Sequence, residues 1–322
     1  MNENKELFES FPIPKALAAL AIPTIISQLI TMIYNMTDTF FIGRTNDPYK
    51  VAAASLAYVL FFIITALSNL FGIGGGSLIS RLLGGQQEHE ARKVCSFSFY
   101  GTIIVTLIYS ACCFLFMNPL LRIMGASDNT IGYASSYTLW VVVIGGVPST
   151  LNMTMAHLLR SEGYAKQASF GVGMGGLLNI ALDPIFMFIL LEPGYEVTGA
   201  AIATMLSNVC ALIYFFIVFA YLRKKTVLSL SPRLILPGTK YIREILLVGL
   251  PSALGTFLAC VSNTTINRLA SGYGDIPVAA IGIVKKIDML PMNVGKGLCQ
   301  GMMPLVAYNY ASKDYKRMHF AA

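Results

Sequence analysis

Charged residues are scarce in this chain. Of its 322 residues only 12% are Asp, Glu, Lys or Arg, whereas 55% are apolar. Soluble domains carry about twice as many charged residues, roughly 25% of the chain. The mean hydropathy of +0.65 points the same way. The shortage of charge therefore excludes an ordinary soluble domain and predicts a membrane protein.

Several motifs of enzymes and cofactor sites are also missing. The six cysteines are scattered, without the Cys-x-x-Cys spacing of zinc or redox sites. The apolar segments hold neither an Asp-x-x-Asp motif nor a His/Asp pair, which an integral membrane transferase would need. GVGMGG at 171–176 lies inside an apolar run, and the Gly-Lys-Ser/Thr of a phosphate loop does not occur. We therefore expect a protein that is not an enzyme and has no cofactor.

Long apolar runs are what the chain has in abundance. A helix of about 20 mostly apolar residues crosses roughly 30 Å of hydrocarbon, and a lipid-exposed chain must satisfy its own backbone hydrogen bonds. Eight runs meet this requirement: 16–42, 52–80, 94–117, 131–157, 168–191, 197–222, 245–270 and 277–308. The predicted fold class is an all-α polytopic membrane protein.

The basic residues are distributed unevenly between the two ends of these runs. If the N-terminus is cytoplasmic, the inner segments hold sixteen Lys and Arg residues and the outer ends hold four. Cytoplasmic loops of membrane proteins carry such an excess. The net charge of +7 is thus explained by topology, and we expect a cytoplasmic N-terminus and no nucleic-acid partner.

The sequence also contains a weak internal repeat. At an offset of 228 residues the matched pairs include Pro23 with Pro251, Asn35 with Asn263, and Thr37 with Thr265. Six runs separate the copies, so both start on the same side of the membrane. A parallel repeat of this kind is typical of secondary transporters, whose substrate site lies between the halves.

The repeat predicts the domain organisation. We expect an N-lobe of six spans at 1–225, a linker at 226–243, and the first two spans of a C-lobe at 244–322. Doubling the repeat gives a parent protein of roughly 450 residues, of which this chain would be a C-terminally truncated form.

Two carboxylates lie within the first six spans. Asp38 is about five residues from the outer end of the first span, and Asp183 is about nine from that of the fifth. Thr204 is about eight residues into the sixth. At a rise of 1.5 Å per residue, all three lie at a similar depth of roughly 8–14 Å. Three pairs, each four residues apart, share a helix face: Tyr34 with Asp38, Asn179 with Asp183, and Thr204 with Asn208.

This layer predicts a cation or proton site. Ionisable residues within a membrane usually mark function, and two close carboxylates suit proton exchange because like charges raise one pKa. Pro184 also frees a backbone carbonyl near Asn179. The expected coupling residues are Asp38, Asp183, Asn179, Tyr34 and Thr204. If the ion is Na+, its expected ligands are Asp38, Asn179, Asp183 and Thr204.

The repeat refines this expectation. The counterpart of Asp38 in the second half is Ile266, although the neighbouring Asn35 recurs as Asn263. The scaffold repeats and the carboxylate does not, which favours a coupling role in the first half alone. Three asparagines are further candidates for the lining of a cavity: Asn35, Asn208 and Asn263.

Six stretches, in this order and spacing, carry a family resemblance. They are AIPTIISQLITMIYNMTDTFFIGR, SRLLGGQQEHEARKV, LLRSEG, NIALDP, TGAAIATMLSN and CQGMMPLVAYNYASKDYKR. With them the chain resembles the multidrug and toxic compound extrusion (MATE) transporters, and among these the MepA-type bacterial exporters. The resemblance covers essentially all 322 residues.

The resemblance implies a fold and a function. MATE proteins have twelve helices in two six-helix lobes and exchange H+ or Na+ for amphipathic, often cationic, drugs. The acid of helix 1 and the Asn-x-x-x-Asp-Pro of helix 5, which carry cation coupling in related members, map onto Asp38, Asn179 and Asp183. The nearby Tyr and Thr map onto Tyr34 and Thr204. We therefore expect an antiporter of a bacterial plasma membrane, acting as a monomer.

Three alternatives stay open. A lipid-linked oligosaccharide flippase of the same superfamily would need a cationic cavity, for which Lys285, Lys286 and Lys296 are the candidates. An integral membrane transferase would need the catalytic sets that the spans lack. The third alternative is a fragment without function, because the resemblance implies helices beyond residue 322.

Overall fold

The computed structural model describes residues 3–223, 225–235, 238–271 and 275–322. The seven longest helices are α2 (Ile13–Gly43), α3 (Pro48–Gly84), α4 (Glu88–Leu115), α8 (Ala165–Ile185), α9 (Glu196–Leu222), α10 (Thr239–Ser271) and α11 (Asp275–Ala311). The shorter helices are α1 (Glu3–Glu9), α5 (Met117–Ile123), α6 (Ile131–Thr138), α7 (Gly146–Ser161) and α12 (Tyr315–Ala321). The described residues contain no strand, as the all-α prediction requires.

Six helices of the described chain are long and apolar enough to cross a membrane: α2, α3, α4, α8 with its extension to Leu190, α9 and α10. A seventh span results if α6 and α7 count as one bent helix. α11 has 37 residues and covers the span expected at 277–308, but several of its side chains lie outside the described residues, so this span stays a prediction. Four charged residues lower its hydropathy: Lys285, Lys286, Asp288 and Lys296.

The fourth predicted span, 131–157, is not one continuous helix. α6 runs into a π-helical turn at Leu139–Ile144, and a bend of 50° separates this stretch from α7. The break falls at Gly145, whose N–H donates to the carbonyl of Trp140 over 2.9 Å. A wide turn that ends at glycine explains the bend. Hydrophobic periodicity did not predict this bend.

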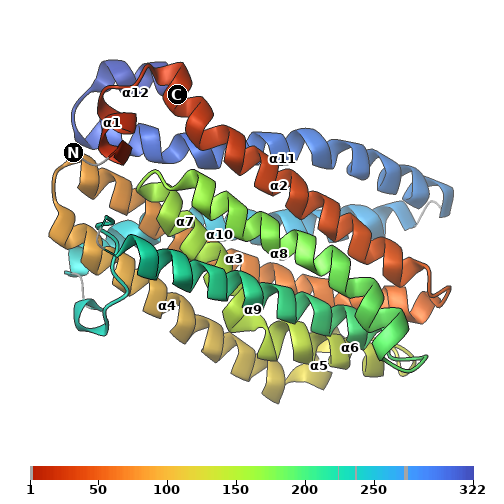
Figure 1. Ribbon diagram of the computed structural model, residues 1–322. Coiled ribbons are helices and arrows are strands. Elements are labelled where there is room, and N and C mark those ends of the chain that lie inside the picture. The colour runs from red at the N-terminus through yellow and green to blue at the C-terminus, as the bar shows by residue number, and fades with distance from the viewer. Residues whose placement is uncertain (1–2, 224, 236–237, 272–274) are drawn as a thin grey trace.

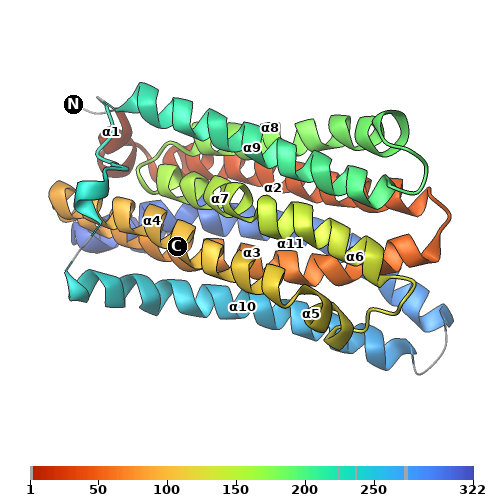
Figure 2. The same ribbon diagram turned by 90° about the horizontal axis from the view of Figure 1, so that it is seen from below.

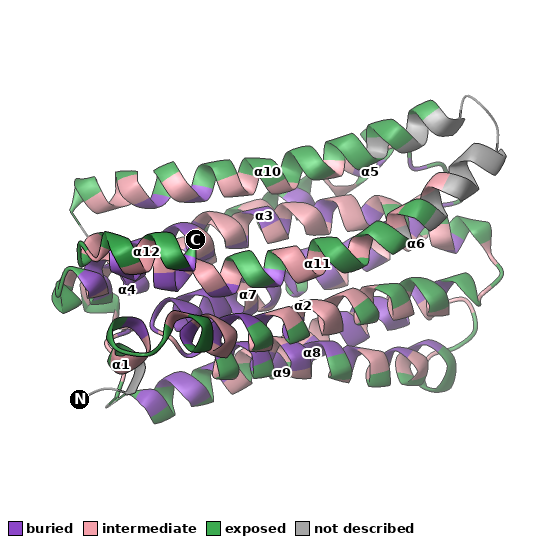
Figure 3. Cartoon of the chain, turned by 90° about the horizontal axis from the view of Figure 1, so that it is seen from above, coloured by how far each residue is buried: buried purple, intermediate pink, exposed green. Residues whose placement is uncertain are grey.

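α7 is the centre of the molecule. Thirteen of its sixteen residues are buried, whereas α10 is largely exposed along its length (Figure 3). α7 packs against α3, α4, α8 and α9. Viewed from below, α8 and α9 lie along one edge of the molecule and α10 along the other (Figure 2). α7 therefore contacts four of the five long helices that precede α10.

We call the end of the bundle where α2 and α8 begin and α3 ends the basic end. α10 and α11 contact α2 and α3 from this end to the middle of these helices. Gln28 Nε2 donates to Gln300 Oε1 over 3.0 Å, joining α2 to α11. Asn69 donates to Thr256 over 2.9 Å, joining α3 to α10. Toward the opposite end α11 diverges from α2 (Figure 1), and Ile287 on α11 is 68% exposed.

An ion pair and close backbone packing reinforce the basic end. Arg81 of α3 pairs with Glu244 of α10 over 3.2 Å. A Cβ at Gly249 would overlap the backbone of Leu70, and a Cβ at Gly301 would lie 2.5 Å from Cα of Ala21. Small residues let membrane helices approach this closely. These contacts hold α10 and α11 against α2 and α3 at the basic end.

The predicted linker at 226–243 is a packed segment. α10 begins at Thr239, so the final residues of that range are helical. Before it, Ser96 and Tyr100 of α4 donate to the carbonyls of Ser231 and Leu230, over 2.6 and 3.1 Å. Side chains of α4 therefore hold this segment against the basic end.

Glu162, which follows α7, is the second anchor of this segment. Its Oε1 accepts the N–H of Val227 over 2.8 Å, and its Oε2 accepts the hydroxyl of Thr226. Burial raises the pKa of Glu162, while the hydrogen bonds from Thr226 and Val227 act in the opposite sense. The carboxyl is 4% exposed, so losing it would leave two donors without an acceptor.

We expect Glu162→Ala to lower the free energy of unfolding by about 1–3 kcal/mol, since buried donors lose their acceptor. Glu162→Gln keeps one acceptor and should cost less. Because the folded-state pKa is raised, the wild-type protein should lose stability relative to Glu162→Gln as pH rises through that pKa. Thermal unfolding in detergent measures both effects, with the exposed Glu192→Ala as control. An equal loss for Ala and Gln would contradict this account.

Candidate functional site

Asp183 and Asn179 lie on one face of α8 and reach α9. Asn179 Nδ2 donates to Asp183 Oδ1 over 3.0 Å and to Thr204 Oγ1 over 3.2 Å. Asp183 is 0% exposed, Asn179 2% and Thr204 7%. α8 continues through Pro184 and becomes π-helical at Phe186–Leu190. The four-residue spacing thus places the acid and the amide directly against α9.

Asn208 and Asn152 extend this set to the central helix α7. Asn208 Nδ2 donates to the carbonyl of Thr204 over 2.8 Å, and its Oδ1 accepts from Asn152 over 3.1 Å. The sequence pointed to Asn208 through its spacing from Thr204. It gave no signal for Asn152, a single amide in an apolar run. We call the five residues of α7, α8 and α9 the polar cluster: Asp183, Asn179, Thr204, Asn208 and Asn152.

Asp38 approaches the polar cluster from α2. Its charge interacts with Asp183 and with Tyr34, four residues earlier on its own helix. A Cβ at Gly176 would lie 3.0 Å from the Tyr34 ring, so this ring packs on the small-residue face of α8. The structure therefore brings together the five residues that were expected to couple an ion.

Two further tyrosines surround the carboxylates. Tyr58 of α3 interacts electrostatically with Asp38. Tyr137 of α6 does so with Asp38 and Asp183, and it is 4% exposed. Sequence reasoning missed both, because a tyrosine in an apolar run usually packs in the core. Their place beside the acids depends on how α3 and α6 meet α2.

The other two candidate lining residues lie outside the cluster. Asn35 is half-buried next to Tyr34 on α2. Asn263 is exposed on α10, where its Nδ2 donates to the carbonyl of Ala259 over 2.9 Å. Its own carbonyl accepts from Lys285 over 3.3 Å. A role of these residues in a cavity stays a prediction.

Three buried oxygens around the acids have no hydrogen-bond donor among the described residues: Asp38 Oδ1, Asn179 Oδ1 and Asp183 Oδ2. The ion pairs of the described residues include neither carboxylate. A buried, unpaired carboxylate is costly unless it gains a proton or a cation. Carboxylate, amide and hydroxyl oxygens are also the ligands that hard cations prefer. The arrangement can therefore hold a proton or a small cation.

The sequence model of the MatE family matches residues 23–185 and 251–322. The chain belongs to the MATE family. Its members are transporters and not enzymes. The "Multidrug export protein MepA" of Staphylococcus saprophyticus is 34% identical over 98% of this chain and 69% of its own length. The protein of the same name from Staphylococcus aureus strain MRSA252 is 33% identical over 97% and 68%.

Solved MATE structures share the fold. The "Crystal structure of MATE in complex with MaD3S" aligns with a TM-score of 0.92 at 27% identity, covering this whole chain and 71% of that one. An outward-facing multidrug resistance MATE transporter aligns at 0.87 and 28%, with 100% and 70% covered. A transporter from Pyrococcus furiosus gives the same values, but its structure's title reports a reversed polarity of the binding pocket and suggests a different function. The MATE fold alone therefore does not settle the substrate, so the residues of the site must be considered.

Proposed function

We propose that this MATE protein is a secondary active antiporter that exports amphipathic or cationic drugs in exchange for H+ or Na+. The observation that carries the proposal is a pair of carboxylates, the half-buried Asp38 and the buried Asp183, which have no ion pair in the part of the chain that the structure describes. An acidic site attracts cations. The MepA relatives, which are named multidrug export proteins, support the choice of drugs as substrates.

Ion binding would act on the position of α2. A proton or Na+ between Asp38 and Asp183 would remove their repulsion and join α2 to α8. α2 also contacts α11 through Gln28 and Gln300, so a shift of α2 would change its contact with α11. The protein would then have two arrangements of α2, one with the ion bound and one without it. A drug that binds one of them more tightly is coupled to the ion, because coupling requires only such a difference in affinity.

The acidity of the site also supports a cationic cargo over a pyrophosphate-linked lipid. Lys285 and Lys296, two of the basic candidates for a flippase cavity, lie on α11, outside the polar cluster. The side chain of Lys286 lies outside the described residues. A transferase is excluded by membership of a transporter family.

The topology of the proposed antiporter follows from its charges. We place the basic end, with the N-terminus, in the bacterial cytoplasm, because sixteen of the basic residues lie there. The six spans of residues 1–225 form the N-lobe in this proposal, and residues 244–322 begin the C-lobe. The transporter acts as a monomer, as expected from a site within one bundle.

Transport by purified protein in liposomes tests the proposal. Liposomes loaded with a fluorescent cation receive a pH gradient in one series and a Na+ gradient in another. We expect dye to move against the flow of one of the two ions and to stop when that gradient is collapsed. Dye flux that ignores both gradients would contradict antiport. No flux from folded protein would show that these 322 residues do not transport by themselves.

A further inference from the structure

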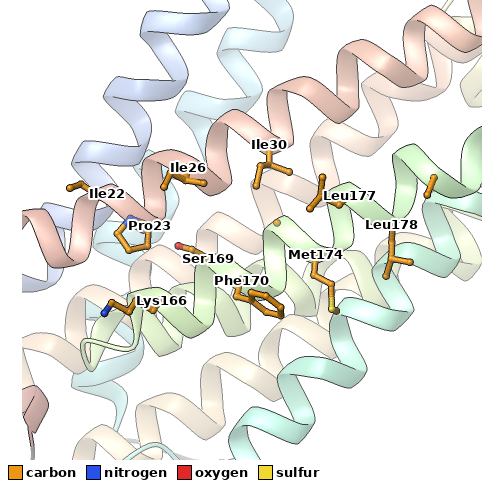
Figure 4. Close-up of a pocket in the computed structure, with 12 residues that line it drawn as sticks. Ile22, Pro23, Ile26, Ile30, Lys166, Ser169, Phe170, Met174, Leu177 and Leu178 are labelled. Atoms are coloured by element: carbon orange, nitrogen blue, oxygen red, sulfur yellow. The ribbon is translucent and has the colours of Figure 1, made fainter.

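A groove between α2 and α8 lies apart from the carboxylates, toward the basic end. Its volume is about 610 Å³, within the range of sites that hold small molecules. Apolar side chains dominate its lining, among them Ile22, Ile26, Phe170, Met174 and Leu177. Figure 4 shows Ile22 and Ile26 on α2, and Phe170, Met174 and Leu177 on α8.

Two polar side chains mark one end of this groove. Lys166, in the first turn of α8, is exposed, and the ion pairs of the described residues do not include it. Ser169 lies one turn further along and is only 7% exposed. Its hydroxyl is buried and has no hydrogen-bond partner within the described residues. A hydroxyl that lines an apolar groove without a partner points to a ligand with a polar atom there.

We infer that this groove is a binding site for one anionic phospholipid, with its phosphate at Lys166 and Ser169 and an acyl chain along the apolar walls. The charge selects the sign of the ligand: Lys166 attracts a phosphate and repels the cationic drugs of the proposed function. Basic pockets between membrane helices bind anionic headgroups in this way. The inference is independent of the carboxylates and of the coupled ion.

The dimensions agree with a lipid in one leaflet. Lys166 and Leu177 are eleven residues apart, which is about 17 Å along a helix. One leaflet supplies about half of the roughly 30 Å hydrocarbon core. A phosphate at Lys166 therefore places the end of the acyl chain beside Leu177, near the middle of the membrane.

The helix that carries Lys166 and Ser169 is packed on two sides. Phe170 contacts the ring of Tyr214 on α9, with centroids 5.3 Å apart, and Tyr214 donates to the carbonyl of Gln167 over 3.2 Å. These contacts pack α8 against α9 next to the groove. Farther along, a Cβ at Gly173 would lie 3.1 Å from Ile30, where the two helices meet.

Native mass spectrometry of the full chain tests the inference, after exchange into nanodiscs of phosphatidylcholine with or without phosphatidylglycerol. We expect one retained phosphatidylglycerol per protein and little phosphatidylcholine. Lys166→Gln should lower this preference about fivefold, the effect of one basic residue on an anionic lipid. Lys240→Gln, an exposed lysine at the same end on α10, is the matched control.

A second variant separates the groove from the membrane surface. Met174→Trp fills the groove and should abolish retention of phosphatidylglycerol, while Ile213→Trp on the exposed face of α9 should leave it unchanged. Equal retention of both lipids, or an unchanged preference in Lys166→Gln, would overturn the inference. So would displacement of phosphatidylglycerol by a fluorescent cation, which would make the groove a drug site. This test uses no transport assay, so its result does not depend on whether the proposed antiport is correct.

Discussion

Asp38→Asn is expected to reduce gradient-driven movement of a fluorescent cation to the level of protein-free liposomes. The amide fills the same space but can neither take up a proton nor attract a cation by charge. Asp38 Oδ1 is buried without a donor among the described residues, so the carboxylate has no structural hydrogen bond there to lose. The variant should therefore fold as well as the wild-type protein and lose only coupling.

Two further variants make this result specific. Asp183→Asn should have the same effect, because its charge interacts with that of Asp38 in one site. Asp128→Asn is the control: it changes an acid whose side chain is 87% exposed and which pairs only with Arg122 on the surface. Efflux by Asp38→Asn at the wild-type rate, with equal expression, would falsify the coupling role.

Na+ and H+ can be distinguished with the same proteins. If Na+ is the coupling ion, Na+ should protect wild-type protein against thermal unfolding, since a ligand that binds only the folded state stabilises it. Asp38→Asn should abolish the protection. If H+ is the coupling ion, Na+ should have no effect beyond that of K+ at equal ionic strength.

Gly249→Ala is expected to open the basic end and to reduce transport. A Cβ at Gly249 would overlap the backbone of Leu70, so α10 cannot remain in contact with α3. Overpacking of this kind costs about 1–3 kcal/mol, which corresponds to a shift of roughly 5–150-fold against the closed arrangement. Transport needs the basic end both closed and open. A protein held in the open arrangement should therefore transport slowly.

The chain provides matched controls for this effect. Gly255 lies on the same helix with nothing within 4 Å of its Cβ position, so Gly255→Ala should be neutral. On α11, Gly301→Ala meets Ala21, whereas Gly295→Ala meets nothing. Gly249→Ala and Gly301→Ala should impair transport, whereas Gly255→Ala and Gly295→Ala should not.

A distance measurement gives the structural readout. Spin labels on His89 and Lys240, both exposed at the basic end, report the separation of α4 and α10. The label pair requires a background without the six native cysteines. The separation should increase in Gly249→Ala and stay unchanged in Gly255→Ala. An unchanged distance in both would contradict the proposed contact.

Helical spacing allowed part of the site to be predicted. Residues four apart on one helix share a face whatever surrounds them, so Asn179 was placed beside Asp183 and Tyr34 beside Asp38. Depth along the helix added Thr204, because the rise per residue is fixed. These are local properties. The roles of the residues in coupling remain to be tested by the variants above.

Contacts between distant segments could not be predicted in this way. Asn152 meets Asn208 because a bend of 50° before α7 directs this helix into the centre of the bundle. Tyr58 and Tyr137 lie beside the acids because α3 and α6 pass them, and nothing in their neighbouring residues indicates this. The expected span at 277–308 lies on α11, a long helix that carries four charged residues in this range, and it stays a prediction.

The sequence by itself determined that the chain is a helical membrane protein with two carboxylates at one depth. Scarce charge and long apolar runs place these segments in lipid. A backbone in lipid must satisfy its own hydrogen bonds, and these runs do so as helices. The tertiary structure alone decided which groups meet: the polar cluster, the closed basic end, and the groove of Lys166 and Ser169. Packing between helices depends on shape along their whole length, so small residues such as Gly249 act only through the helix that approaches them.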